Sequence, residues 1–152
     1  MSLFTWWRLL FPAEEMLCLS GPVSQAGVCH LDQAVSLEPD SSSTVHFQPT
    51  PESVYSALKR FKRFGYGLKV IIHSHPGEGS LATMPSSTDR QTLERHERSC
   101  RAIGMIVTRD GYLRAFADAL NFELKIYGAG VEVINEKQKL FQLTTTDSSS
   151  ID

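Results

Sequence analysis

The strongest constraint on the fold is the stretch V-I-I-H-S-H-P at residues 70–76. Residues 68–72 are almost entirely apolar and rich in β-branched side chains, which is typical of a strand buried on both faces. Pro76 ends this strand, because proline cannot donate a hydrogen bond to a sheet. Side chains two apart on a strand point the same way, so His73 and His75 project together from its carboxyl end.

Two adjacent imidazoles are poorly explained by packing, since each must satisfy two ring nitrogens. A lone buried histidine is more often structural, but a pair that closes an apolar strand favours a divalent metal ion. A catalytic zinc ion typically has three protein ligands and keeps a fourth position for water. Asp89, in S-S-T-D at residues 86–89, is the natural third ligand. The same S-x-x-D pattern is also typical of a capping box, and a helix starting near the strand end would satisfy both interpretations.

A water molecule at such a site needs a base. Glu14 and Glu15 immediately precede an apolar run at residues 16–20, and one of them can point inward, although glutamates before strands are usually solvated. Cys18 lies within that run and is expected to be a core residue rather than a nucleophile. The other histidines (His30, His46 and His96) lack partner spacing, and His96 is expected to face solvent.

The remaining pattern predicts one mixed α/β domain over residues 1–143, followed by a flexible tail at 144–152. A helix is expected to begin after Thr50, with Pro51 in its first turn, and to end at Gly65 or Gly67. A second, mostly polar helix follows S-S-T-D. Strands are expected at residues 16–20, 28–37, 122–127 and 131–134, with a hairpin over residues 103–117.

The composition excludes several classes of function. The 152 residues carry 15 Lys and Arg against 17 Asp and Glu, so no basic surface is expected for nucleic acid or an acidic membrane. Three cysteines without a C-x-x-C pair favour a reducing cytoplasm over a disulfide framework. The apolar residues 1–12 lack the features of a signal peptide, and no stretch is long enough to span a membrane. That segment is expected to pack on the core or to meet a partner, which leaves a dimer open.

The order of an upstream glutamate, H-S-H-P and S-S-T-D resembles the JAMM (MPN-plus, or JAB) metalloprotease family. The resemblance covers residues 13–89 by motif and the rest by the order of strands and helices. It implies an MPN/JAB-like domain, a curved and mostly antiparallel sheet flanked by helices. It also implies that His73, His75 and Asp89 hold Zn²⁺.

The resemblance assigns two catalytic roles as well. Glu14 would be the general base, because the family's glutamate stands seven residues before a glycine, here Gly21. Ser86 would donate a hydrogen bond to the oxyanion. One departure is the spacer of nine residues between Pro76 and Ser86, which is longer than the family usually shows. This loop, with glycines at 77 and 79, is expected to be mobile and to alter substrate access rather than to abolish metal binding.

Members of the family cleave after the C-terminal glycine of ubiquitin or a ubiquitin-like protein. A bare domain of this size looks like the stand-alone prokaryotic members, which are associated with ubiquitin-like conjugation systems, some of them antiphage. The expected activity is therefore a zinc-dependent isopeptidase or peptidase acting on a ubiquitin-like conjugate or precursor. E1-like or E2-like proteins of the same system are expected partners.

Three alternatives remain at this point. A non-catalytic scaffold of the same fold typically lacks the glutamate or a ligand, and all of these positions are filled here. A DNA-repair-associated branch shares the H-x-H-P core, but the chain has no basic surplus. An amidohydrolase barrel also ends a strand in H-x-H, but it needs about 200 residues or more.

Overall fold

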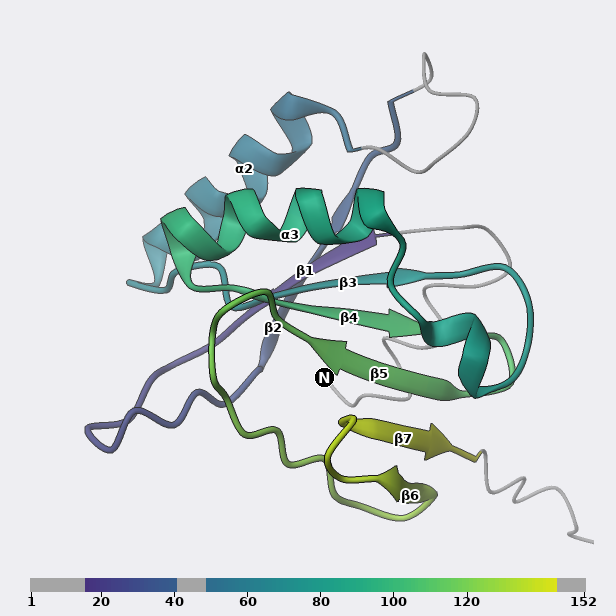
Figure 1. Ribbon diagram of the computed structural model, residues 1–152. Coiled ribbons are helices and arrows are strands. Elements are labelled where there is room, and N and C mark those ends of the chain that lie inside the picture. Colours follow the sequence, from purple (N-terminus) through teal and green to yellow (C-terminus); the bar gives the residue numbers. More distant parts are fainter. Residues whose placement is uncertain (1–15, 41–48, 145–152) are drawn as a thin grey trace, which may run out of the picture.

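The computed structural model describes residues 16–40 and 49–144 (Figure 1). In this part of the chain seven strands form one sheet in the order β2-β1-β3-β4-β5-β7-β6. The strands are β1 Met16–Ser20, β2 Gln33–Leu37, β3 Val70–Ser74, β4 Ile103–Val107, β5 Tyr112–Phe116, β6 Val131–Asn135 and β7 Leu140–Leu143. The helices are α2 Pro51–Arg63, the 3₁₀ turn η1 Ser80–Thr83 and α3 Ser87–Cys100. The predicted mixed α/β class is confirmed. Within the same residues, no helix combines the length and apolarity needed to cross a bilayer.

The only parallel pair among these strands is β3 with β4, and every other pair is antiparallel. Parallel neighbours need a crossover connection, which η1 and α3 provide. In such a unit the carboxyl end of the first strand and the amino end of the helix lie at the same edge of the sheet (Figure 1). The ends that carry His73 and Asp89 are therefore brought to one place.

The helix α2 begins and ends as its sequence predicts. The Thr50 side chain accepts a hydrogen bond from the Ser53 backbone N–H at 3.2 Å, and Pro51 occupies the first turn. Ala57 and Phe61 are buried against the sheet. The helix ends before Gly65, whose φ of 75° is the left-handed conformation that glycine adopts easily.

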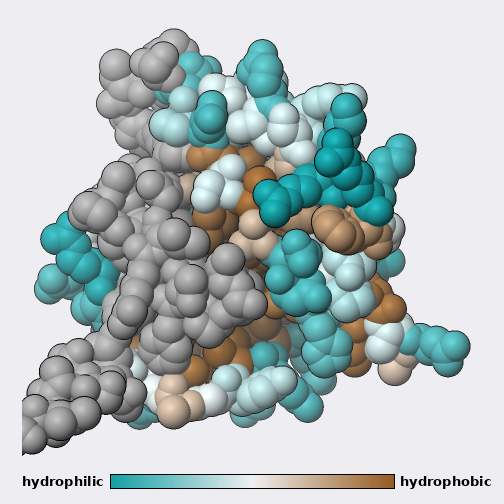
Figure 2. All heavy atoms as spheres, turned by 180° about the vertical axis from the view of Figure 1, so that it is seen from behind, coloured by the Kyte–Doolittle hydropathy of each residue, from teal (hydrophilic) through white to brown (hydrophobic). Residues whose placement is uncertain are grey.

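The sheet separates two hydrophobic clusters because side chains alternate between its faces. The cluster below the helices contains Met16, Cys18 and Ile71 together with the buried residues of α2. The other face carries Leu17, Ile72 and their neighbours in β4, β5 and β7. Seen from behind, hydrophobic side chains gather near the middle of the molecule and hydrophilic ones lie mostly toward its outline (Figure 2).

Residues 122–127 do not form the predicted strand. They are an extended segment in which every second side chain is half-buried, and Phe122, Leu124 and Ile126 pack on the second cluster. The period of two arises because one side of an extended chain is buried, without ladder pairing. The predicted strand at residues 131–134 is present as β6, and its partner β7, which was not predicted, buries Leu140, Phe141 and Leu143. The predicted strand at 28–37 is limited to β2.

The start of the extended segment is fixed to α3 by one carboxylate. Glu97 accepts hydrogen bonds from the backbone N–H groups of Asp118 at 2.7 Å and Ala119 at 2.9 Å, and also from that of Leu120. Near the end of the described chain, the Thr144 backbone N–H donates to the Gly130 carbonyl at 2.8 Å. Residue 144, which was expected to begin the flexible tail, is therefore hydrogen-bonded to the residue before β6. Residues 145–152 lie outside the described part of the chain.

Gly21 provides a test of packing next to β1. A Cβ at this position would lie 1.7 Å from the His30 carbonyl oxygen. We expect Gly21→Ala to lower the free energy of unfolding by about 1–3 kcal/mol, the usual cost of overpacking. Denaturant unfolding measures the change. Gly67→Ala is the matched control, because its Cβ would have no heavy atom within 4 Å. Equal losses in the two variants would contradict this account.

Candidate metal site

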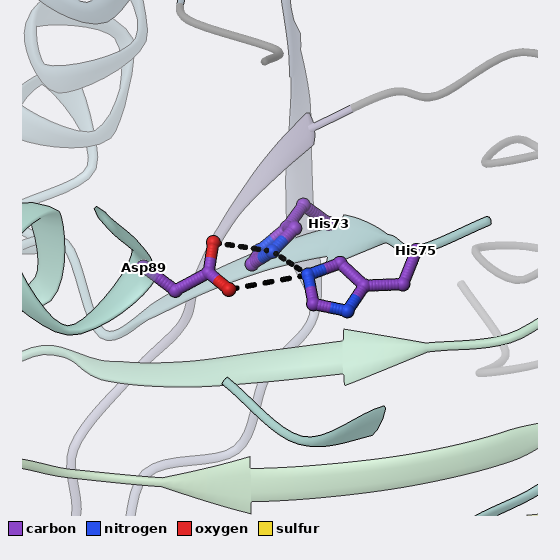
Figure 3. Close-up of side chains that lie close together, drawn as sticks. All are labelled: His73, His75 and Asp89. Atoms are coloured by element: carbon purple, nitrogen blue, oxygen red, sulfur yellow. Dashed lines mark hydrogen bonds and ion pairs between the residues drawn. The ribbon is translucent and has the colours of Figure 1, made fainter. Parts of the chain in front are cut away.

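Three side chains meet where the carboxyl end of β3 faces the start of α3 (Figure 3). His73 is in β3, His75 follows it, and Asp89 is in the first turn of α3. The His75 backbone N–H donates to the Val107 carbonyl at 3.0 Å, so the pairing with β4 extends one residue beyond the strand. Both imidazoles are therefore held by sheet backbone, and they project from the same face as predicted.

The distances in this cluster match those around a small metal ion. The Nε2 atoms of His73 and His75 are 3.0 Å apart. His73 Nε2 lies 3.1 Å from Asp89 Oδ1, and His75 Nε2 lies 3.2 Å from Asp89 Oδ2. A tetrahedral ion with bonds of about 2.0–2.1 Å separates its ligand atoms by about 3.3 Å. The three residues thus fit a zinc ion with little rearrangement.

The hydrogen bonding of His75 also favours a cation at this point. Its Nδ1 lies 2.9 Å from the Ala82 carbonyl oxygen, which can only accept, so Nδ1 carries a proton. In neutral His75 the Nε2 atom is then a lone-pair acceptor, and it faces Asp89 Oδ2, another acceptor. Two acceptors at 3.2 Å repel each other unless a proton or a metal ion lies between them. A metal-bound histidine typically makes this kind of second hydrogen bond.

Asp89 caps α3 and its carboxylate also faces the two histidines, so its position is compatible with both interpretations of its sequence pattern. Ser86 Oγ accepts from the Asp89 backbone N–H at 3.1 Å, and Asp89 Oδ2 accepts from the Ser86 backbone N–H at 2.7 Å, which is a complete capping box. Partial burial raises the pKa of the Asp89 carboxyl, but the adjacent imidazoles, which donate to it when they carry a proton on Nε2, and the hydrogen bond from the Ser86 backbone lower it by more. The resulting pKa is well below the ordinary value for aspartate, so the carboxylate is charged and ready to bind a metal ion.

The cluster is enclosed but accessible. The side chains of His73, His75 and Asp89 are 13%, 20% and 16% exposed. Each of the three side chains therefore keeps some contact with solvent, which a site with an exchangeable fourth position requires.

The loop at residues 77–85 is anchored at three points. The Gly79 backbone N–H donates to Asp110 Oδ2 at 2.8 Å, and the Ala82 carbonyl accepts from His75. The fully buried Thr83 accepts from Arg114 Nε at 3.0 Å. Gly77 and Gly79 have positive φ values of 98° and 85°, a conformation that glycine adopts easily. They are therefore needed for the path of the loop as well as for any mobility. The loop was expected to alter substrate access without abolishing metal binding, and the structure adds that Ala82 contacts a candidate ligand directly.

The remaining predicted residues fall into two groups. Ser86 is exposed at the start of α3, and its oxygen accepts the cap bond while the hydroxyl proton can still be donated. Glu14 and Glu15 lie outside the described residues, as does His46. Cys18 is a core residue, and burial raises the pKa of its thiol to about 12, which rules out a nucleophilic thiolate near neutral pH.

Two other histidines differ in their surroundings. His30 is exposed, in keeping with its lack of partner spacing. His96 is half-buried rather than solvent-facing, and burial lowers its pKa.

Two parts of the site were not predicted from the sequence. The Ala82 carbonyl is a backbone group that every residue has, so the sequence does not indicate its role. Arg114 stands among apolar residues in Y-L-R-A-F of β5, and a charged residue inside an apolar strand is a signal that was available.

A comparison with protein-family models and a comparison with curated proteins both found no match to this chain.

The cluster makes a direct prediction about metal content. We expect purified protein to carry about one zinc ion per chain, and His73→Ala, His75→Ala and Asp89→Asn to lose it. The asparagine oxygen can still accept from the Ser86 N–H, so α3 should persist in circular dichroism while the anionic ligand is gone. Elemental analysis provides the measurement, with Gln91→Ala on the exposed side of α3 as the control. Full zinc in all three ligand variants would exclude the site, and iron in place of zinc would indicate a different chemistry.

Proposed function

We propose that this chain is a zinc-dependent isopeptidase or peptidase of the JAMM (MPN-plus) type, with an MPN/JAB-like domain. The observation that carries the proposal is the triangle of His73, His75 and Asp89, which has ligand spacing, is partly exposed and has Ser86 at the adjacent helix start. The mixed sheet with helices over one face is compatible with such a domain.

The three ligand residues would hold Zn²⁺, which lowers the pKa of a coordinated water to about 7. Ala82 keeps His75 in the tautomer that presents Nε2, and the capping box fixes Asp89 through the helix backbone. The Ser86 hydroxyl would donate a hydrogen bond to the oxygen of the substrate carbonyl as negative charge develops there. Its own oxygen, which accepts from the Asp89 N–H, is held in place by that bond.

We take Glu14 rather than Glu15 as the general base, because Glu14 stands seven residues before Gly21, as the glutamate of the JAMM family does. Met16 pairs with His73 in the antiparallel β1–β3 ladder. If that ladder continued by two residues, position 14 would stand opposite His75, and directly opposed residues have side chains on the same face of a sheet. Glu14 would accept a proton from water and return it to the leaving amine.

The proposed substrate is a ubiquitin-like protein, cleaved after its C-terminal glycine during deconjugation or processing. Leu81 and Met84, 83% and 50% exposed, lie in the loop that contacts the site through Ala82. Exposed apolar side chains next to a reactive centre suit contact with a globular partner. E1-like and E2-like proteins of a conjugation system are the proposed partners.

The two glutamates give the sharpest test of the activity. Glu14→Gln should retain zinc and lose nearly all turnover, because an amide cannot accept the proton from water. Glu15→Gln is the matched control and should behave like the wild type. Turnover is measured with ubiquitin-like proteins carrying a C-terminal fluorophore or a lysine-linked partner.

Each other outcome has a clear meaning. Reversed results for Glu14→Gln and Glu15→Gln would shift the register by one residue. Zinc-loaded protein that cleaves none of these substrates would favour a non-catalytic scaffold. Equal cleavage of short tail peptides and folded substrates would indicate a general peptidase.

Ser86 is expected to act on catalysis separately from its role as a cap. Ser86→Ala should lower kcat by about 10²–10³-fold, the typical loss for one oxyanion donor. It also removes a cap, which costs about 1 kcal/mol of stability. Thr50→Ala removes the equivalent cap of α2, away from the site, and should lower stability by a similar amount without lowering kcat. Unchanged kcat in Ser86→Ala would remove Ser86 from the mechanism.

A further inference from the structure

Arg114 is a buried cation on the same face of the sheet as the metal ligands. His73 pairs with Ile106 of β4, and Ile106 pairs with Arg114 of β5, so the three side chains share one face. Only 8% of Arg114 is exposed. Its guanidinium donates to Thr83 Oγ1 at 3.0 Å and to Gln138 Oε1 at 3.1 Å, both neutral acceptors.

Arg114 forms no ion pair with a carboxylate in the described part of the chain. Burying a charge without a counter-charge is costly, and burial lowers the pKa of this guanidinium. A charged donor makes stronger hydrogen bonds than a neutral one, so Arg114 can hold its two acceptors firmly in place.

The bond to Thr83 acts on the metal site through one peptide unit. Thr83 is fully buried at the end of η1, and its neighbour Ala82 supplies the carbonyl that accepts from His75 Nδ1 at 2.9 Å. The Thr83 hydroxyl also donates to the Ser80 carbonyl, which closes the turn. The position of the Ala82 carbonyl is therefore set by a turn that Arg114 ties to β5.

We propose that Arg114, acting through Thr83 and the Ala82 carbonyl, is a positioning residue that holds His75 in the tautomer and orientation needed to bind the metal ion. The proposal rests on the proposed metal site but does not require any particular substrate. It assigns the long loop a part in building the site, in addition to bordering it.

The tautomer of His75 can be measured in metal-free protein by long-range ¹H–¹⁵N correlation spectra. We expect the Nδ1–H form in the wild type, and a mixture of tautomers in Arg114→Met and Thr83→Val. Thr83→Ser keeps the hydroxyl and should restore the single form. Gln138→Ala removes the other partner of Arg114 but leaves the bond to Thr83, so it should also resemble the wild type.

Metal affinity is the second readout, measured by competition with a chromophoric chelator. Arg114→Met and Thr83→Val should weaken zinc binding by about 10-fold or more, as loss of an outer hydrogen-bond partner typically does. Thr83→Ser and Gln138→Ala should bind as the wild type does. The visible spectrum of the cobalt-substituted protein should change in the first pair alone, which a mere loss of stability would not cause.

The outcomes separate this proposal from the proposed function. The role of Arg114 would be overturned, and the metal site left intact, by the following result. The wild type binds zinc, and Arg114→Met and Thr83→Val show the same zinc affinity and the same His75 tautomer as the wild type. Absence of zinc binding in the wild type would overturn both. Should Arg114→Met fail to fold, the contrast between Thr83→Val and Thr83→Ser decides the question at a single position.

Discussion

The parallel pairing of β3 with β4 is the constraint from which the rest of the site follows. Parallel neighbours cannot be joined by a tight turn, so the chain must travel back along the sheet before β4 begins. Here α3 makes that return, and its first turn consequently lies beside the end of β3. An antiparallel pairing of the same strands would remove the need for α3, and Asp89 would have no reason to approach the histidines.

The site combines structural and chemical uses of the same atoms. Asp89 holds the backbone of Ser86 with one oxygen, and both of its oxygens lie near imidazole nitrogens. The carboxylate is thus oriented by the helix cap before any metal ion binds, which limits the rearrangement that binding requires. In neutral His75 the Nε2 lone pair faces the Asp89 carboxylate, and a cation placed between these two acceptors would relieve their repulsion. The capping box therefore holds Asp89 in a position that a bound cation would stabilise.

The sequence predicts the site better than it predicts the sheet around it. The shared direction of His73 and His75 follows from strand geometry, and the place of Asp89 at the helix cap and beside the histidines follows from S-x-x-D before a helix. Residues 122–127 were misassigned because burial of alternate side chains depends on an extended backbone and one covered side, not on hydrogen-bonded neighbours. The tie from Arg114 to Thr83 joins residues 31 positions apart and was not predictable, because local patterns do not report which distant strand a loop covers. Glu14 lies outside the described residues, and its role stays a prediction.

The interior place of β3 limits how a polypeptide can approach. Both edges of β3 are paired, with β1 on one side and β4 on the other, so an incoming chain cannot join the sheet beside the histidines. It must instead lie across the strand ends, where neighbouring backbones give it no continuous ladder. Under the proposed peptidase activity, a substrate segment would therefore have to be free of the hydrogen-bonded structure of its own protein. The interior position of β3 would then favour an unstructured tail over a well-folded surface, including the surface of a second copy of this chain.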